Sequence, residues 1–277
     1  MTITATQPAP IIDAALVDEF AIVGAVIVRG LFGPDEVATI ERGIERVLAD
    51  PSPRFKVASS ATDPGSFVED FCNWQRIEEV RQVAVHSRAA DVAAALTGSD
   101  RVRLFHDHVL VKEPNTQQET PWHQDQPYYN VDGFDNCSMW APVDPVAAES
   151  TLEFVAGSHR QGWLMPRTFM TNEAKWFPEG SLSDLPDIEA NRADHDIRGW
   201  AMEPGDAVFF HMLTLHHAYG VAGTARRRAF SLRFLGDDMV HAPRRWVTSP
   251  QFDGLEEQLP AGAPMDHELF PVLRERG

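Results

Sequence analysis

The chain has 277 residues, a length at which one domain can bury a large core without a metal or disulfide to hold it together. Its 41 acidic and 24 basic residues give a formal net charge of −17, which argues against binding to nucleic acid or to an anionic membrane surface. Only Cys72 and Cys137 are present, and the first ten residues lack the charged start and apolar core of a secretion signal, so we expect a cytoplasmic protein without disulfides.

The N-terminal third of the chain predicts helices. Residues 1–10 are rich in Pro and Thr and are expected to form a flexible tail, followed by a single folded domain over residues 11–277. Pro34 stands at a first-turn position, and apolar residues then recur at helical spacing up to Leu48. A second helical segment is expected from Ile77 to Leu96, with Gly98 as its C-terminal cap. No apolar run is long enough to cross a membrane.

From Arg101 onward the apolar period changes from helical to two. The segments that carry it are VRLFHDHVLVK, CSMWAPVD, STLEFVAGSH, DAVFFH and RAFSLRFL. Short segments rich in β-branched and aromatic residues predict a mainly β fold with flanking helices (α+β), namely a double-stranded β-helix or cupin-like jelly roll, with its core at about 101–236. The polar segment 160–196 has no sustained period and includes Trp163 and Trp176. It is either an active-site lid or a structural surface loop, and both interpretations remain open.

His123, Asp125 and His216 form the main chemical motif. On a strand, residues i and i+2 point the same way, so His123 and Asp125 can reach one ion while Gln124 points elsewhere. His216 follows 93 residues later (216 − 123) and can come from a strand that faces the first across a barrel. Two imidazoles and one carboxylate suit a facial triad that holds Fe(II) and leaves three positions open. The sequence therefore predicts a metal-dependent enzyme.

Four motifs together resemble the phytanoyl-CoA dioxygenase family of Fe(II)/2-oxoglutarate oxygenases. They are PWHQDQPYY, ESTLEFVAGSHRQG, EPGDAVFFHMLTLHHAYG and RRRAFSLRF, in family order from about Phe105 to Phe234. The resemblance implies Fe(II), 2-oxoglutarate and O2 as cofactor and co-substrates, with succinate and CO2 as co-products. It does not imply a CoA thioester as substrate, and because the acidic chain offers no obvious basic groove for the CoA phosphates, we expect a smaller metabolite.

The resemblance also assigns the tandem histidines. The family pattern G-D-x-x-x-F-H-x-x-x-x-H places the distal ligand at His216 and leaves eleven residues (227 − 216) to Arg227. His217 then points away from the metal, and His211 is expected to be a hydrogen-bonding residue rather than a ligand. Arg227 is expected to bind the distal carboxylate of 2-oxoglutarate, because a guanidinium offers two parallel N–H donors.

Further pocket residues follow from the resemblance and from strand alternation. Positions matching those beside the co-substrate in the family are His106, His108, Gln124 and Trp140. Alternation places Arg227, Ala229, Ser231 and Arg233 on one face of their strand, and Leu104, His106, His108, Leu110 and Lys112 on one face of an earlier strand. Candidate substrate contacts are Phe67, Trp74, Tyr128, Tyr129, Arg160, Trp163 and Arg233, although aromatic residues of this kind are more often part of a core. Where the family often has a hydroxyl residue, this chain has Ala218, so a hydrogen bond to the co-substrate is either missing or supplied by Tyr219.

These residues predict hydroxylation of an unactivated C–H bond in a small metabolite. Retention of the carboxylate at Asp125 disfavours halogenation, whereas desaturation, epoxidation and cyclisation can follow the same hydrogen abstraction. Two other functions remain open: a cupin-type metal hydrolase or isomerase, and a non-catalytic small-molecule-binding protein of the same fold. Neither the substrate nor the oligomeric state is encoded in these patterns.

Overall fold

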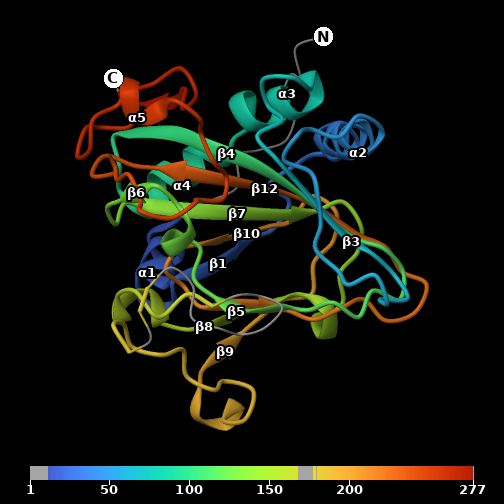
Figure 1. Ribbon diagram of the computed structural model, residues 1–277. Helices are drawn as coiled ribbons and strands as arrows, with labels where there is room; N and C mark the ends of the chain where they lie inside the picture. The colour runs from blue at the N-terminus through green and yellow to red at the C-terminus, as the bar shows by residue number, and fades with distance from the viewer. Residues whose placement is uncertain (1–11, 168–176, 179, 277) are drawn as a thin grey trace.

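The structure, a computed structural model, describes residues 12–167, 177–178 and 180–276 (Figure 1). The tail expected at residues 1–10 and Trp176 of the polar insertion lie outside these residues. Two antiparallel sheets face each other, and in Figure 1 the smaller one lies below the larger. The predicted jelly roll with flanking helices is therefore confirmed. No helix in the described ranges has the length and apolar character needed to span a membrane.

The larger sheet has the strand order β1-β10-β7-β12-β4-β3-β2, with β14 also paired to β4. Its strands are β1 Ala25–Val28, β2 Lys56–Val57, β3 Phe67–Phe71, β4 Arg101–Lys112, β7 Asn136–Pro142, β10 Ala207–Phe210, β12 Arg227–Leu235 and β14 Val272–Glu275. The smaller sheet has the order β5-β11-β8-β9. Its strands are β5 Thr120–His123, β8 Leu152–Val155, β9 Ile197–Arg198 and β11 His216–Ala218. A separate pair of short strands consists of β6 Val131–Asp132 and β13 Val240–His241. Each of the five segments predicted to be extended contains one of these strands.

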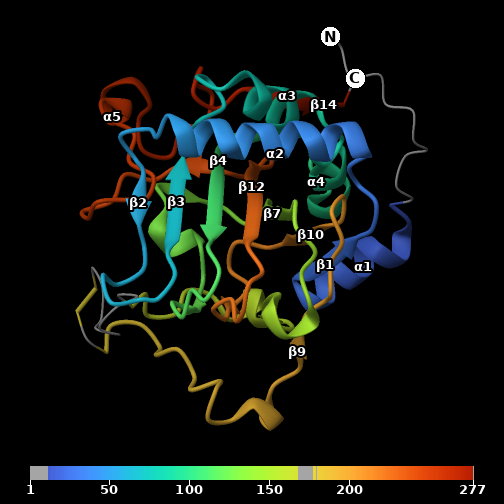
Figure 2. The same ribbon diagram turned by 90° about the vertical axis from the view of Figure 1, so that its right-hand side faces the viewer.

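Helices cover the outer face of the larger sheet. They are α1 Ala14–Val23, α2 Pro34–Ala49, α3 Glu78–His86 and α4 Ala89–Thr97. The short α5 Leu255–Gln258 packs in a separate cluster with Phe105 and Phe270. Helix α2 begins at Pro34 as predicted, and the Glu36 side chain accepts a hydrogen bond from the Gly33 N–H at 2.9 Å. Its buried face, with Ile44 and Val47, belongs to the same core as Phe230 and Phe234 of β12. Figure 2 shows α2 lying across these strands.

The helix expected over residues 77–96 is two helices. Ser87 has an extended backbone, and its hydroxyl accepts a hydrogen bond from the Ala89 N–H at 3.4 Å, so that it ends α3 and begins α4. Gly98 ends α4 in the left-handed conformation with φ of 72°, as predicted. Helix α1 was not predicted; Asp13 accepts a hydrogen bond from the Leu16 N–H at its start.

A β-bulge changes one of the predicted strand faces. Arg233 of β12 pairs with His106, but Phe234 pairs with Leu104, so Phe105 is an extra residue in β4. An extra residue reverses the alternation on one side of the bulge. Leu104 therefore packs in the core beneath the helices rather than on the inner face with His108, and the prediction for Leu104 was wrong.

Candidate active site

A cavity of about 900 Å³ opens between the two sheets. Residues on the inner faces of β4 and β12 mark its depth. Lys112 lies opposite Arg227 at one end and Leu110 lies opposite Ala229, while Arg233 lines the other end. The smaller sheet forms the facing wall. Its cavity residues are Thr120, His123, Leu152, His216 and Ala218.

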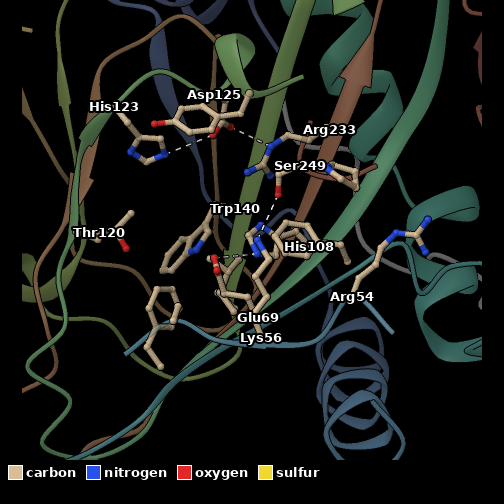
Figure 3. Close-up of a pocket in the computed structure, with 18 of the residues that line it drawn as sticks. Arg54, Lys56, Glu69, His108, Thr120, His123, Asp125, Trp140, Arg233 and Ser249 are labelled. Atoms are coloured by element: carbon tan, nitrogen blue, oxygen red, sulfur yellow. Dashed lines mark hydrogen bonds and ion pairs between the residues drawn. The ribbon is translucent and has the colours of Figure 1, made fainter. Parts of the chain in front are cut away.

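His123, Asp125 and His216 converge on one wall of this cavity, as Figure 3 shows for the first two. His216 of β11 pairs directly with His123 of β5, and their ring centroids are 4.1 Å apart. Asp125 Oδ1 lies 3.5 Å from His123 Nε2 and 3.7 Å from His216 Nε2. One donor atom from each residue lies within 4.8 Å of the others. These are separations that one bound ion can bridge.

Both histidines present the correct nitrogen to this centre. Nδ1 of His123 lies 2.8 Å from the Pro121 carbonyl oxygen, and Nδ1 of His216 lies 2.9 Å from that of Thr214. Because a carbonyl only accepts, each Nδ1 carries the hydrogen, and each Nε2 keeps its lone pair for a metal. Burial, together with the charge of His123, lowers the pKa of His216 to about 3, so its imidazole is neutral at pH 7.

Asp125 is held in an orientation that leaves one oxygen for the metal. Its Oδ2 accepts hydrogen bonds from Arg233 Nε at 3.0 Å and from Ser138 Oγ at 3.1 Å. Burial opposes ionisation, but Arg233 and His123 nevertheless hold the pKa of Asp125 well below its usual range. Two imidazole nitrogens and one carboxylate fit a divalent ion, and the set suits Fe(II).

His217 and His211 lie away from this centre. The ring of His217 stacks on Trp122 with centroids 5.0 Å apart, and it lies beside Glu153 and Glu189. Those two carboxylates are already bound by Arg192, at 2.8 and 3.1 Å. His211 accepts a hydrogen bond from the Leu213 N–H, and its Nε2 donates to the Phe134 carbonyl at 2.8 Å.

Arg227 lies at the end of the cavity away from Arg233. It donates to the Ser150 carbonyl and, at 3.3 Å, to the Tyr219 carbonyl. Lys112, its neighbour on β4, donates to the carbonyls of Gln118 and Tyr219 at 2.7 and 3.0 Å. In the part of the chain that the structure describes, neither cation forms an ion pair. Burial lowers the pKa of Arg227 to about 10, which leaves it charged at pH 7.

Several predicted pocket residues line the cavity. They are Phe67, His108, Tyr128, Tyr129, Trp140 and Arg233. His108 Nε2 lies 3.2 Å from Glu69 Oε1, and its ring stacks on Phe71. The Tyr219 hydroxyl donates to Glu189 at 3.1 Å on the outer surface, so it does not supply the hydrogen bond that Ala218 lacks.

Other predicted pocket residues lie outside the cavity lining. His106 packs among Phe71, Phe105 and Tyr129. Gln124 holds the insertion: its amide donates to the carbonyls of Gly162 and Leu213, both at 2.9 Å, and accepts from the Leu164 N–H.

Trp74, Arg160 and Trp163 are also absent from the lining. Trp74 packs against the helical core, and the Arg244 guanidinium lies 4.9 Å from the Trp163 ring. No described residue between 160 and 196 lines the cavity, which favours the structural interpretation for that part of the insertion.

The mouth of the cavity comes from two segments that the sequence did not single out. Residues 53–59 and 247–251 line it. Lys56 Nζ donates to Ser249 Oγ at 3.3 Å, and Arg54 donates to the Gln251 carbonyl at 2.9 Å. The sequence feature that could have indicated this part of the site is the run Arg54-Phe55-Lys56, in which two cations flank an aromatic residue.

Comparison with known proteins gives both a family and a fold. The sequence pattern of the phytanoyl-CoA dioxygenase family matches residues 20–229. A probable phytanoyl-CoA dioxygenase of Caenorhabditis elegans is 27% identical over 200 residues, which cover 66% of this chain and 55% of that protein. The chain thus spans about half the length of the nematode relative. An ectoine dioxygenase of Stutzerimonas stutzeri (strain A1501) is 28% identical over 254 residues, or 84% of this chain and 80% of that protein.

Solved structures share the fold. The non-heme alpha-ketoglutarate-dependent carbocyclase SnoK from nogalamycin biosynthesis matches with a TM-score of 0.75 at 22% identity, over 96% of this chain and 98% of that one. EctD from S. alaskensis with 2-oxoglutarate and 5-hydroxyectoine matches with a TM-score of 0.68 at 21% identity, over 98% and 89%. The chain therefore belongs to the phytanoyl-CoA dioxygenase family and is an Fe(II)- and 2-oxoglutarate-dependent oxygenase.

Proposed function

We propose that this enzyme hydroxylates an unactivated C–H bond of a small molecule. In that reaction 2-oxoglutarate becomes succinate and CO2, and one oxygen atom of O2 enters the product. The observation that carries the proposal is the convergence of two imidazoles and one carboxylate on the wall of a 900 Å³ cavity. That volume lies within the range of small-molecule sites, about 300–1,000 Å³.

His123, Asp125 and His216 are the proposed metal ligands. Fe(II) held there with 2-oxoglutarate supplies the oxidising chemistry that removes hydrogen from an unactivated carbon. All three donors come from one wall, so a metal ion held there would be accessible from the cavity. Asp125 retains a carboxylate where a halide would otherwise bind, so hydroxylation is favoured over halogenation.

Arg227 is the proposed anchor of the co-substrate. It is a buried guanidinium with no ion-pair partner among the described residues. On β12 it lies two residues before Ala229 and four before Ser231, and Ser231 lies opposite His108. A carboxylate placed there can accept charge-assisted hydrogen bonds from the N–H groups of Arg227 that do not donate to the carbonyls of Ser150 and Tyr219. Trp140 and Leu110 line the stretch of cavity between Arg227 and the metal ligands and keep it poor in water.

The named relatives support small-molecule chemistry. Two are ectoine dioxygenases, and one solved structure holds 2-oxoglutarate together with 5-hydroxyectoine. Other structures of the fold are a carbocyclase and an epimerase, so the test must separate oxygen insertion from rearrangement.

The test is a metabolite-panel assay under 18O2. Purified protein receives Fe(II), ascorbate, 2-oxoglutarate and one candidate substrate at a time, and succinate and product mass are both measured. Hydroxylation gives one succinate for each product, which gains one 18O atom. A product formed without added oxygen would replace hydroxylation with rearrangement or desaturation. The proposal would be refuted if, with every compound of the panel, the parent protein formed no more succinate than His216→Ala.

A further inference from the structure

The charges that line the cavity are unbalanced. The cationic residues in the lining are Arg54, Lys56, Lys112, Arg227 and Arg233, and the carboxylates are Glu69 and Asp125. Five cations against two carboxylates leave an excess of three positive charges, in a chain whose net charge is −17. The charges of Fe(II) and of the 2-oxoglutarate dianion cancel, so the excess persists when both are bound. Burial and the nearby Arg227 lower the pKa of Lys112 to about 6, and an uncharged Lys112 still leaves an excess of two.

Three of these cations already have a role. Arg233 pairs with Asp125 at 3.0 Å. Arg227 and Lys112 lie opposite each other at the far end of the cavity, where the distal carboxylate of 2-oxoglutarate is proposed to bind. The cations left without a role are Arg54 and Lys56.

Arg54 and Lys56 lie at the mouth, and the carboxylate of the residue opposite Lys56, Glu69, lies 3.2 Å from His108. Arg54 donates a hydrogen bond to the neutral Gln251 carbonyl, and Lys56 donates one to the neutral Ser249 hydroxyl. Neither forms an ion pair within the described ranges of the chain. Arg228, on the other face of β12, binds three carboxylates in the same acid-rich protein. In Figure 3, Arg54 lies on the far side of His108 from His123, and Lys56 lies beside Glu69 and His108.

Apolar side chains also lie near these two cations. The Lys56 ammonium lies 4.5 Å from the centre of the Phe71 ring. Val57 and Val247, on the two segments of the mouth, are 60% and 66% exposed, which is unusual for valine in this chain. Deeper in the cavity the walls include Tyr128. Cations at the rim with apolar walls beneath suit a molecule with an acidic group and an apolar body.

We infer that the substrate is a small organic anion whose acidic group binds Arg54 and Lys56 at the mouth and whose apolar body extends toward His123 and Asp125. This inference rests on the proposed function, because it names the substrate class of the same site. It places the reacting carbon on the apolar part of the molecule, away from the acidic group.

Two dyes with nearly the same skeleton test this inference. Anilinonaphthalene sulfonate carries one negative charge, and N-phenyl-1-naphthylamine is neutral. Protein loaded with Mn(II) and 2-oxoglutarate is titrated with each dye, and fluorescence gives the dissociation constants. We expect Arg54→Met/Lys56→Met to weaken sulfonate binding on the order of ten- to a hundredfold, as for lost hydrogen bonds to a charged group, and to leave the neutral dye unchanged.

Two further variants serve as controls. Arg54→Lys/Lys56→Arg keeps both charges and should keep sulfonate binding, which separates charge from folding. Arg46→Met/Arg81→Met removes the same two charges from exposed helical positions outside the cavity and should have no effect.

Three outcomes would overturn the inference. They are unchanged sulfonate binding by Arg54→Met/Lys56→Met, an equal loss of both dyes, and binding of neither dye by the parent protein. Dye binding requires no turnover, so a failed succinate assay alongside charge-selective binding would count against the proposed hydroxylation and not against the anion site.

Discussion

The two adjacent histidines of β11 differ in function because neighbouring side chains on a strand point to opposite faces. His216 Nε2 faces Asp125 at 3.7 Å, whereas His217 stacks on Trp122 behind the metal site. We expect His216→Ala to abolish Mn(II) binding and turnover and His217→Ala to leave both largely intact. Isothermal titration with Mn(II) measures the first effect and succinate formation the second. The reverse result would move the metal ligand to His217.

Arg233 should affect the metal without touching it. Its Nε and the Ser138 hydroxyl both bind Oδ2 of Asp125, so Oδ1 stays directed at the two histidines. Residues that orient a ligand in this way typically contribute about 10- to 100-fold to metal affinity. Arg233→Leu should weaken Mn(II) binding by that factor, measured by electron paramagnetic resonance of the free ion. Arg226→Leu, which removes a surface arginine paired with Glu45, is the matched control. Equal affinities for the two variants would make Arg233 a substrate residue instead.

Arg227 should act on the co-substrate and not on the metal. Arg227→Ala loses a charge-assisted bidentate interaction of about 2–3 kcal/mol, so the apparent requirement for 2-oxoglutarate should rise while Mn(II) affinity stays the same. The neighbouring Arg228 points to the opposite face and pairs with Asp144, so Arg228→Ala should leave the requirement unchanged. An unaltered requirement in Arg227→Ala would place the anchor elsewhere, and Lys112 would be the next residue to test.

At the level of elements, strand alternation predicted most of the inner face of β12. Arg227, Ala229 and Arg233 line the cavity, whereas Ser231 is not in the lining. His216 was expected on a strand facing that of His123 across the barrel, but the two strands are paired neighbours in one sheet. Alternation failed on β4 because the bulge at Phe105 adds one residue that leaves no trace in the apolar pattern.

The mouth of the cavity was not predictable for a different reason. Residues 53–59 and 247–251 have no period of their own, and hydrogen bonds between residues nearly two hundred positions apart bring them together. Aromatic residues of the insertion, such as Trp163, suggested a lid, but their position depends on packing against Arg244. Sequence patterns therefore located the chemistry of the site more accurately than its entrance.

Gln124 connects two elements, which gives a prediction at this level. Its side chain pairs with the backbone of Gly162, Leu164 and Leu213, joining the start of the insertion to the loop before β11. Gln124→Leu would leave buried backbone groups without partners, at a cost of about 1–3 kcal/mol each. We expect a lower urea midpoint with unchanged affinity for 2-oxoglutarate. Weaker 2-oxoglutarate binding at unchanged stability would instead support the co-substrate role that the family resemblance implies.

At the level of the whole molecule, one face of the larger sheet packs in the hydrophobic core and the other lines the cavity. The outer face of the larger sheet carries apolar residues such as Phe230 and Phe234 beneath α2, while its inner face carries the charges of the cavity. A strongly acidic chain thus encloses a cationic cavity. The positive potential of the cavity should be stronger at low ionic strength than at high salt, because exposed charges are screened within about 10 Å at 0.1 M.

The interior also makes stability depend on pH. Burial lowers the pKa of six histidines in the folded protein: His106, His108, His159, His211, His216 and His217. For His211 the pKa falls from 6.5 to about 4. A histidine whose pKa is lowered on folding binds fewer protons in the folded state than in the unfolded state, so stability falls as the pH decreases below 6.5. Burial raises the pKa of Asp107 to about 6 and also raises that of Asp135, and these two carboxyl groups oppose the trend.

We therefore expect the free energy of unfolding of the metal-free protein to decrease as the pH falls from 6.5 toward 4. Each histidine that stays neutral in the folded state contributes a slope of up to about 1.4 kcal/mol per pH unit. Urea midpoints in EDTA at pH 7.5, 6.5, 5.5 and 4.5 measure the effect. In His211→Gln the unfolding free energy should depend less steeply on pH, because one fewer histidine takes up a proton on unfolding. A constant midpoint between pH 7 and pH 5 would mean that the buried rings gain protons without unfolding, because water reaches them in the native state.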